Sequence, residues 1–336
     1  MPRTLLCTAV ALFALTFLSA AAAADGGPTP GTIEGGAGVL GTDVRYVTVG
    51  SGHETTLEAV QLNGGKVVRW TNIAGSWGIP AVTFDGVTGG LASNRSRIVL
   101  GGTGVGTCTP ARCSMLRRTS RFAIFNPKTL SRQMILALKG DFSFDALSPN
   151  GRMLYLIEHR SSTNLTSYLV RAYDLTLERL RPNAIADRTQ RGWVMHGTPV
   201  SRATTANGRF VYTLYQNQGG YPFVHALDTV RGVAHCVGLP WTGDQSVIST
   251  MKLSLHDNGR TLMATVPWTG SSPPATLPSF SIDTHTYGVS QPAQPGPAHG
   301  GFPWWLLGFA VVPLLLFSAL RRIRRRPGTS WARASV

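Results

Sequence analysis

Two carboxylates in the middle of the chain have the spacing that acid–base chemistry requires. Asp141 and Asp145 flank Phe142 and Phe144 in the run Gly-Asp-Phe-Ser-Phe-Asp. Because side chains alternate along a strand, a strand here would place both carboxylates on one face, as an acid–base pair needs. The alternative is structural, with Asp141 in a turn and Asp145 capping a neighbouring backbone amide. We favour the structural alternative.

Several histidines beside carboxylates raise the question of a metal site. His159 follows Glu158, His256 precedes Asp257, and His196 lies in a region where loops are expected. No two histidines are three or four residues apart, whereas a zinc site needs about four converging ligands. The sequence also lacks a P-loop, a dinucleotide fingerprint, an HExxH motif, an EF-hand loop and a G-x-S-x-G elbow. We therefore expect no metal and no cofactor.

Four tryptophans lie in segments expected to connect strands. They are Trp77, Trp193, Trp241 and Trp268. Exposed tryptophans on such loops would form a stacking surface for a glycan or a protein, so we assign them as candidate ligand-binding residues. The alternative, which we favour, is that they pack between sheets.

Cysteine usage fits an exported protein. Cys108 and Cys113, in a loop rich in glycine and threonine, are the candidate disulfide pair, because disulfides persist in oxidising compartments. Cys236 is expected to be a buried thiol in a strand, and Cys7 lies in the segment that is removed on export.

Both ends of the chain carry membrane signals. Arg3, an apolar run over 5–18 and small residues up to Ala24 have the pattern of a signal peptide. Residues 302–320 contain no charge and are followed by six arginines in 321–336. A helix of this length spans about 28 Å, enough for a bilayer core, and the arginines are expected on the cytoplasmic side. We therefore expect a single-pass protein of the cell membrane, with its N-terminal domain outside and its C-terminus in the cytoplasm.

The domain boundaries follow from these signals. We predict a signal peptide (1–24), an N-terminal linker (25–42), an ectodomain (43–290), a stalk rich in proline and glycine (291–301), a transmembrane helix (302–320) and a basic cytoplasmic tail (321–336).

The net charge of +15 does not indicate nucleic-acid binding. Without Arg3 and the six arginines of the tail, the ectodomain has 24 basic and 16 acidic residues. Part of the excess is therefore a signal for membrane orientation. The remaining excess, which includes Arg117, Arg118 and Arg121, would favour an anionic envelope polymer or lipid headgroup, or belong to a solvated face.

The body of the chain repeats two markers. An apolar strand ends in an Asx-like turn at Asn63, Asn126, Asp174, Asp228 and Asp283. Asn-Gly-Arg precedes an apolar strand at 150–152, 207–209 and 258–260. Asn-Gly between alternating runs is a strong hairpin signal. A repeat of about 50 residues with short strands and no long helix predicts an all-β fold, a β-propeller of about five blades with four antiparallel strands each. We place full blades near 79–138, 143–183, 198–238 and 250–290, and a partial blade near 37–70. We expect closure through 39–49.

These phrases resemble a known family. Ser148-Pro149-Asn150-Gly151-Arg152-Met153-Leu154-Tyr155-Leu156 and Tyr46-Val47-Thr48-Val49-Gly50-Ser51-Gly52 look like the SPDGR-x-LYV and YVTN phrases of bacterial YVTN/YncE-type, WD40-like propellers. The resemblance covers about 43–290 and implies a propeller fold, but not one function, because such propellers serve as binders, scaffolds and enzyme frames.

Two functions from different classes fit this sequence. We favour a membrane-anchored module that binds an envelope protein, a glycan or a small ligand, and not nucleic acid. The alternative is a propeller enzyme, lactonase-like or dehydrogenase-like, with acids and histidines at the mouth of the channel. The enzyme hypothesis requires at least three of Asp141, Asp145, Glu158, His159, His196 and His256 in one cluster.

Overall fold

The computed structural model describes most of the region between the predicted membrane signals. It covers residues 32–33, 38–51, 53–103, 108–109, 112–113, 116–189, 195–217, 220–267 and 277–291, with backbone only for 32–33, 108–109 and 112–113. The predicted signal peptide (1–24) and transmembrane helix (302–320) lie outside these residues. No helix within the described ranges has the length and apolar character needed to span a bilayer.

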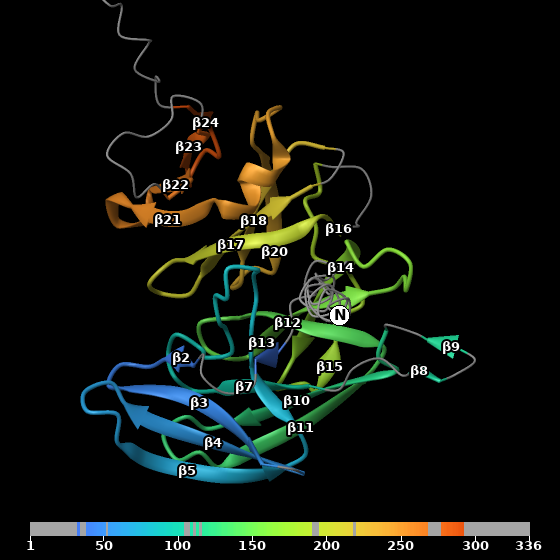
Figure 1. The fold of residues 1–336 in the computed structure, drawn as a ribbon, viewed down its shortest axis with the longest axis vertical. Coiled ribbons are helices and arrows are strands. Elements are labelled where there is room, and N and C mark those ends of the chain that lie inside the picture. Colours follow the sequence, from blue (N-terminus) through green and yellow to red (C-terminus); the bar gives the residue numbers. More distant parts are fainter. Residues whose placement is uncertain are drawn as a thin grey trace, which may run out of the picture. The chain divides into compact units, whose positions relative to one another are not determined.

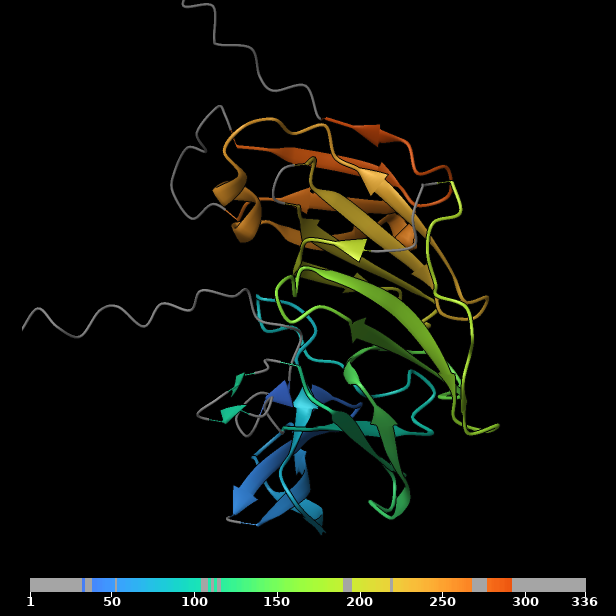
Figure 2. The same cartoon turned by 90° about the vertical axis from the view of Figure 1, so that its right-hand side faces the viewer.

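The first two sheets contain the N-terminal third of the fold (Figure 1, Figure 2). The first sheet has the order β2 (Val39–Leu40), β3 (Val44–Ser51), β4 (Glu54–Gln61) and β5 (Val67–Ala74). The second sheet has the order β1 (Thr32–Ile33), β6 (Trp77–Pro80), β7 (Ile98–Gly102), β10 (Thr119–Phe125) and β11 (Arg132–Lys139). Between β7 and β10, β8 (Cys108–Thr109) and β9 (Arg112–Cys113) form a small hairpin.

Three further sheets follow in sequence order. The third sheet contains β12 (Asp141–Leu147), β13 (Met153–His159), β14 (Ser167–Asp174) and β15 (Arg179–Leu180), with β16 (Met195–His196) also paired to β14. The fourth contains β17 (Thr198–Thr204), β18 (Phe210–Gln216), β19 (Phe223–Asp228) and β20 (Val233–Gly238). The fifth contains β21 (Lys252–His256), β22 (Thr261–Thr265), β23 (Ser279–Asp283) and β24 (Val289–Ser290).

Two short 3-10 helices complete the regular elements within the described ranges, η1 (Gln245–Thr250) and η2 (Asp257–Gly259). The pairings within the five sheets are antiparallel. The prediction of an all-β fold built from consecutive antiparallel sheets of about four strands each is confirmed for the described residues, with a fifth short strand in the second and third sheets. Such meanders are the blades from which a β-propeller is assembled.

The Asx marker ends a strand because the Asp side chain accepts hydrogen bonds from the amides that follow it. These amides no longer pair with a neighbouring strand. Asp228 Oδ1 accepts hydrogen bonds from the amides of Val230 and Arg231, both at 3.0 Å. Asp174 accepts from the amides of Thr176 and Leu177 at 3.0 and 3.1 Å. A side-chain oxygen that binds the next two or three amides fixes the turn.

The two markers meet in the fold. Arg152 Nη2 lies 3.0 Å from Asp174 Oδ2, and Arg209 Nη2 lies 2.8 Å from Asp228 Oδ2. Each pair joins the residue just before the second strand of a sheet to the last residue of the third strand. In the third and fourth sheets the Asn-Gly-Arg turn therefore has two roles. Its glycine adopts a positive φ, 68° at Gly151, and its arginine forms an ion pair with the neighbouring strand.

Four buried apolar clusters join consecutive sheets. Leu57 and Ile98 belong to the cluster between the first and second sheets, and Phe122 and Leu154 to the one between the second and third. Two more clusters join the third to the fourth sheet and the fourth to the fifth. Because each sheet has apolar side chains on the face that meets its neighbour, this burial is the main stabilising contribution.

The segment 81–97 between β6 and β7 forms hydrogen bonds and an ion pair with later sheets. The Ser96 hydroxyl donates to the Asn150 carbonyl at 3.0 Å, and the Ser93 hydroxyl donates to the Asn207 carbonyl at 2.8 Å. Asp85 Oδ2 lies 2.9 Å from Lys252 Nζ of β21. A single connection therefore contacts the third, fourth and fifth sheets.

The structure pairs the 39–49 segment differently from our expectation. Val39 and Leu40 lie opposite Tyr46 and Arg45, and the other edge of β3 pairs with β4. Both edges of β3 are thus used within the first sheet, because the chain reverses after Leu40 and pairs locally. Among the described strands, no strand of the fifth sheet pairs with the first sheet.

Candidate functional site

Asp145 forms a buried ion pair instead of an open acid–base site. Arg202 Nη2 lies 2.5 Å from Asp145 Oδ1, and the two side chains are 6% and 4% exposed. Arg202 also donates to the Asp145 carbonyl and to Thr213 Oγ1. This pair joins β12 of the third sheet to β17 of the fourth.

Asp141 has a separate arginine partner. Arg117 Nε donates to Asp141 Oδ1 at 2.6 Å, and its Nη2 donates to the Phe142 carbonyl at 2.7 Å. A register shift between Phe144 and Ala146 makes Asp145 a bulge residue, so simple alternation does not relate it to Asp141. Neither sequence interpretation described the result, because the partners are arginines far away in sequence.

Buried imidazole and phenol groups lie beside these ion pairs. His159 is directly opposite Asp141, and its ring centroid lies 5.8 Å from that of Tyr168. The ring centroids of Tyr168 and Tyr215 are 6.1 Å apart, and those of Tyr215 and His225 are 6.3 Å apart. Burial raises the pKa of both phenols, and burial lowers the pKa of His225 to about 4, with opposing contributions from Asp145 and Arg202. At neutral pH these four rings are uncharged.

His225 is expected to make the fold sensitive to acid. Because its pKa is about 4 in the folded chain and near 6.5 when unfolded, the unfolded chain gains a proton first as pH falls. The free energy of unfolding should therefore fall by up to about 3 kcal/mol between pH 6.5 and 4, and this group should have no effect above pH 6.5. Denaturant titrations at several pH values measure this, and H225F should have a shallower slope. The exposed-site control, H256F, should keep the native slope; an unchanged slope in H225F would contradict the assignment.

The remaining acid and histidine candidates are dispersed. Glu158 pairs with Arg171 at 2.5 Å, His196 is exposed in β16, and His256 Nε2 lies 2.9 Å from Ser254 Oγ. Within the part of the chain that the structure describes, no three histidine, cysteine or acidic side chains form a group suited to a metal ion.

Two of the four candidate tryptophans lie in the described ranges. Trp77 is 1% exposed, donates from Nε1 to the Ala74 carbonyl at 2.9 Å, and has Arg121 over its ring at 5.1 Å. Trp241 is half-buried against the core between the fourth and fifth sheets. Trp193 and Trp268 lie outside the described residues, so the stacking surface stays a prediction.

Cys108 and Cys113 lie on paired strands, and Cys236 lies in a strand. Cys108 is directly opposite Cys113 in the β8–β9 hairpin, a position with a Cα separation of about 4.5–5.5 Å. This separation suits a disulfide, for which the Cα atoms are about 4.4–6.8 Å apart. The bond stays a prediction because these side chains lie outside the described part. Cys236 is half-buried in β20, and burial raises its pKa to about 12.

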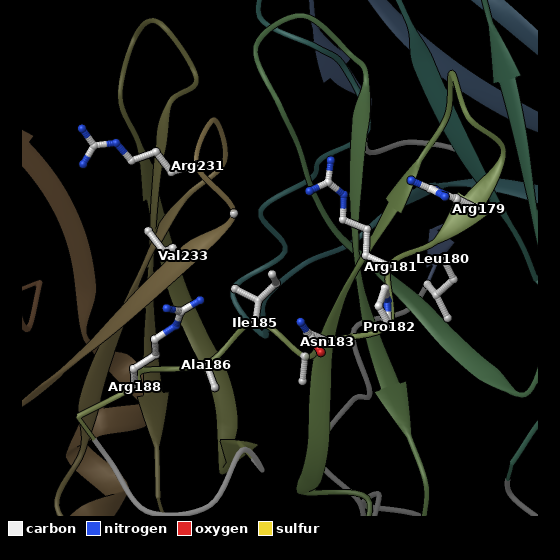
Figure 3. A pocket seen from close by; sticks show the side chains of 12 residues that line it. Arg179, Leu180, Arg181, Pro182, Asn183, Ile185, Ala186, Arg188, Arg231 and Val233 are labelled. Atoms are coloured by element: carbon white, nitrogen blue, oxygen red, sulfur yellow. The ribbon is translucent and has the colours of Figure 1, made fainter.

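A basic pocket that the sequence analysis did not predict lies at the outer strands of the third and fourth sheets (Figure 3). Its volume is about 690 Å³, and it is lined by four arginines: Arg179, Arg181, Arg188 and Arg231. The rest of its lining is mainly apolar and includes Leu180, Pro182, Ile185 and Val233.

The segment 184–188 forms the floor because it is bound to both sheets. The Ile185 amide donates to the Val170 carbonyl of β14 at 2.8 Å, and Asp187 Oδ2 accepts from the Cys236 amide of β20 at 2.8 Å. Ile185 is 9% exposed and belongs to the core between these sheets. The floor is therefore held by a main-chain hydrogen bond to the third sheet and by the Asp187 carboxylate, bound to a main-chain amide, on the side of the fourth sheet.

The wall of the pocket on the side of the fourth sheet is the tight turn between β19 and β20. Gly232 has a φ of 67°, and a Cβ there would lie 3.4 Å from Tyr155 Oη. The Asp228 side chain binds the amide of Arg231 in the same turn. Glycine thus permits the close approach that brings Arg231 and Val233 to the pocket.

The positive charge of the pocket is only partly compensated. Arg181 lies 3.7 Å from Asp174, whose nearer partner is Arg152 at 3.0 Å. No ion pair involving Arg179, Arg188 or Arg231 occurs among the described residues. Asp187 is buried below them and is bound by its own partners, which include His235 at 3.0 Å. Uncompensated arginines around an apolar floor favour an anion.

Comparisons with known proteins give distant similarity only. No family model and no curated protein matches the chain. Hydrazine synthase of Kuenenia stuttgartiensis is 13% identical, with a TM-score of 0.40 over 74% of this chain and 62% of that one. TolB of Acinetobacter baumannii is 11% identical, with a TM-score of 0.39, and the match covers 75% of this chain and 52% of TolB. The β-propeller domain of the Trilobed protease of Pyrococcus furiosus is 10% identical, with a TM-score of 0.39, and the match covers 79% of this chain and 72% of that domain.

The chain thus spans between half and two thirds of the first two of these proteins. Similarity at this level says nothing about activity. The class of the protein follows from its own sheets, which are consecutive antiparallel meanders of four or five strands, of the β-propeller kind.

Proposed function

We propose that this protein is a single-pass membrane protein whose extracytoplasmic sheets form a binding module for an anionic component of the cell envelope, which binds at the arginine pocket. The observation that carries this proposal is the group of four arginines around an apolar floor, three of them with no ion pair among the described residues. The resemblance of 43–290 to YVTN/YncE-type propellers is compatible with such a role.

The binding proposal is favoured over an enzyme by the state of the carboxylates. Asp141 and Asp145, the residues on which a lactonase-like or dehydrogenase-like site would depend, are buried and bound to Arg117 and Arg202. A carboxylate in a buried ion pair is poorly placed to exchange protons with a substrate from solvent. The arginine pocket, in contrast, is lined by side chains that solvent reaches.

Binding can be tested with the full chain in nanodiscs and a fluorescent polyphosphate as the probe. Each charge-assisted contact contributes about 1.5–3 kcal/mol, so the R181Q/R188Q double variant should bind at least tenfold more weakly. R45Q/R69Q removes the same charge from exposed positions of the first sheet and should bind as the native chain does. Equal losses in both double variants, or no binding by the native chain, would overturn the proposal.

Membrane orientation has its own test. Cysteines are introduced one at a time by K66C, in an exposed turn of the first sheet, and by S330C, in the predicted tail. An impermeant maleimide on intact cells should label K66C, and should label S330C only after permeabilisation, with the native chain as the blank. Labelling of S330C on intact cells would contradict the predicted topology.

A further inference from the structure

The arginines of the pocket form two groups separated by the apolar floor. Arg179 and Arg181 belong to the outer edge of the third sheet, where β15 ends. Arg188 follows Asp187, which is bound to β20, and Arg231 lies in the turn before β20, so both belong to the fourth-sheet side. Figure 3 shows the two groups on opposite sides of Ile185.

Apolar side chains occupy the space between these groups. Leu180 and Pro182 lie on the third-sheet side, Ile185 in the middle and Val233 on the fourth-sheet side. An apolar floor cannot solvate an anion, so negative charge on a ligand is favoured at the two arginine groups and disfavoured between them. A ligand with anionic groups joined by a less polar spacer matches this arrangement, in which the apolar floor separates the two arginine groups.

On the basis of the proposed function, we propose that the pocket selects a linear polyanion, a chain whose repeated phosphate or carboxylate groups are joined by less polar units, by binding separate anionic groups at the two arginine pairs. Once the first group is bound, binding of the second is intramolecular, which raises overall affinity. A ligand with one anionic group can use only one arginine pair.

The arrangement also predicts a mechanical consequence. A polyanion that contacts Arg179 and Arg181 on one side and Arg188 and Arg231 on the other bridges the third and fourth sheets. It binds the folded chain and not the unfolded one, so it should raise the melting temperature. A ligand at a single arginine pair leaves the junction unbridged.

The test measures affinity by calorimetry and melting temperature for the full chain in nanodiscs. The probes are inorganic phosphate, galacturonic acid and its oligomers, long-chain polyphosphate, and vesicles of phosphatidylglycerol. From the monomer to oligomers with several carboxylates, the affinity per anionic group should rise at least 100-fold, and at equal concentrations of anionic groups the melting temperature should rise more with the oligomers than with the monomer.

Variants of each arginine group complete the test. R179Q/R181Q and R188Q/R231Q should each reduce oligomer affinity to that of the monomer, whereas R45Q/R69Q should preserve the difference. If monomers and oligomers bind equally well per group, the polyanion inference is wrong and the anion-binding function stands. If only vesicles bind, the ligand is a lipid headgroup and the inference is again wrong. If no probe binds, the proposed function itself fails.

Discussion

Replacing Arg202 with leucine is expected to lower the free energy of unfolding by about 3–5 kcal/mol. The substitution leaves the Asp145 carboxyl group, which is 4% exposed, without its guanidinium partner. A buried carboxylate without a partner costs much more than the pair itself contributes. The loss should be seen as a lower midpoint in denaturant for the full chain in detergent.

Two matched variants test this explanation. R202L/D145L removes both charges and should recover most of the lost stability, because no buried charge is left unpaired. R171L removes a pair with Glu158 whose side chains are 15% and 21% exposed, so its cost should be smaller. If R202L costs less than about 1 kcal/mol, the surface value for an ion pair, Asp145 is not buried as described.

Replacing Trp77 with alanine is expected to cost about 3–5 kcal/mol, the second large effect. Its ring is 1% exposed in the core between the first and second sheets, and a truncation there leaves a cavity. If Trp77 served instead as a stacking surface, W77A would weaken ligand binding and leave stability nearly unchanged.

The exposed Trp70 provides the matched control for this experiment. Trp70 is 65% exposed on β5, so W70A should change the free energy of unfolding by no more than about 0.5 kcal/mol. Thermal melting of both variants, with polyphosphate binding measured in parallel, separates packing from recognition. A stable W77A chain with reduced binding would contradict the packing assignment.

The repeat was predictable because its signals are local. Asx turns such as that at Asp228 and the glycine of Asn-Gly-Arg act within a few residues, so their function can be inferred from the sequence alone. Their spacing also indicated the order of the sheets. The ion pair between Arg209 and Asp228 was not predicted, although both residues belong to the two markers.

The candidate site was less predictable because its contacts join distant residues. Asp145 and Arg202 are 57 positions apart, and nothing near either one indicates the pairing. Arg121 was grouped with Arg117 as possible anion-binding charge, yet it lies over the ring of Trp77. The arginine pocket depends on Ile185 and Asp187 being bound to different sheets, which no local pattern shows. The alternation of Arg179 and Arg181 was the one signal present in the sequence.

The most direct test of the central claim is hydrogen exchange of the full chain in nanodiscs, with and without long-chain polyphosphate. The account predicts slower exchange in Leu180–Arg188 and Arg231–Val233, the segments that line the pocket, and loss of this protection in R181Q/R188Q. Protection confined to the basic tail (321–336), or no change in the two pocket segments despite binding, would show that the anion binds elsewhere and would contradict the account.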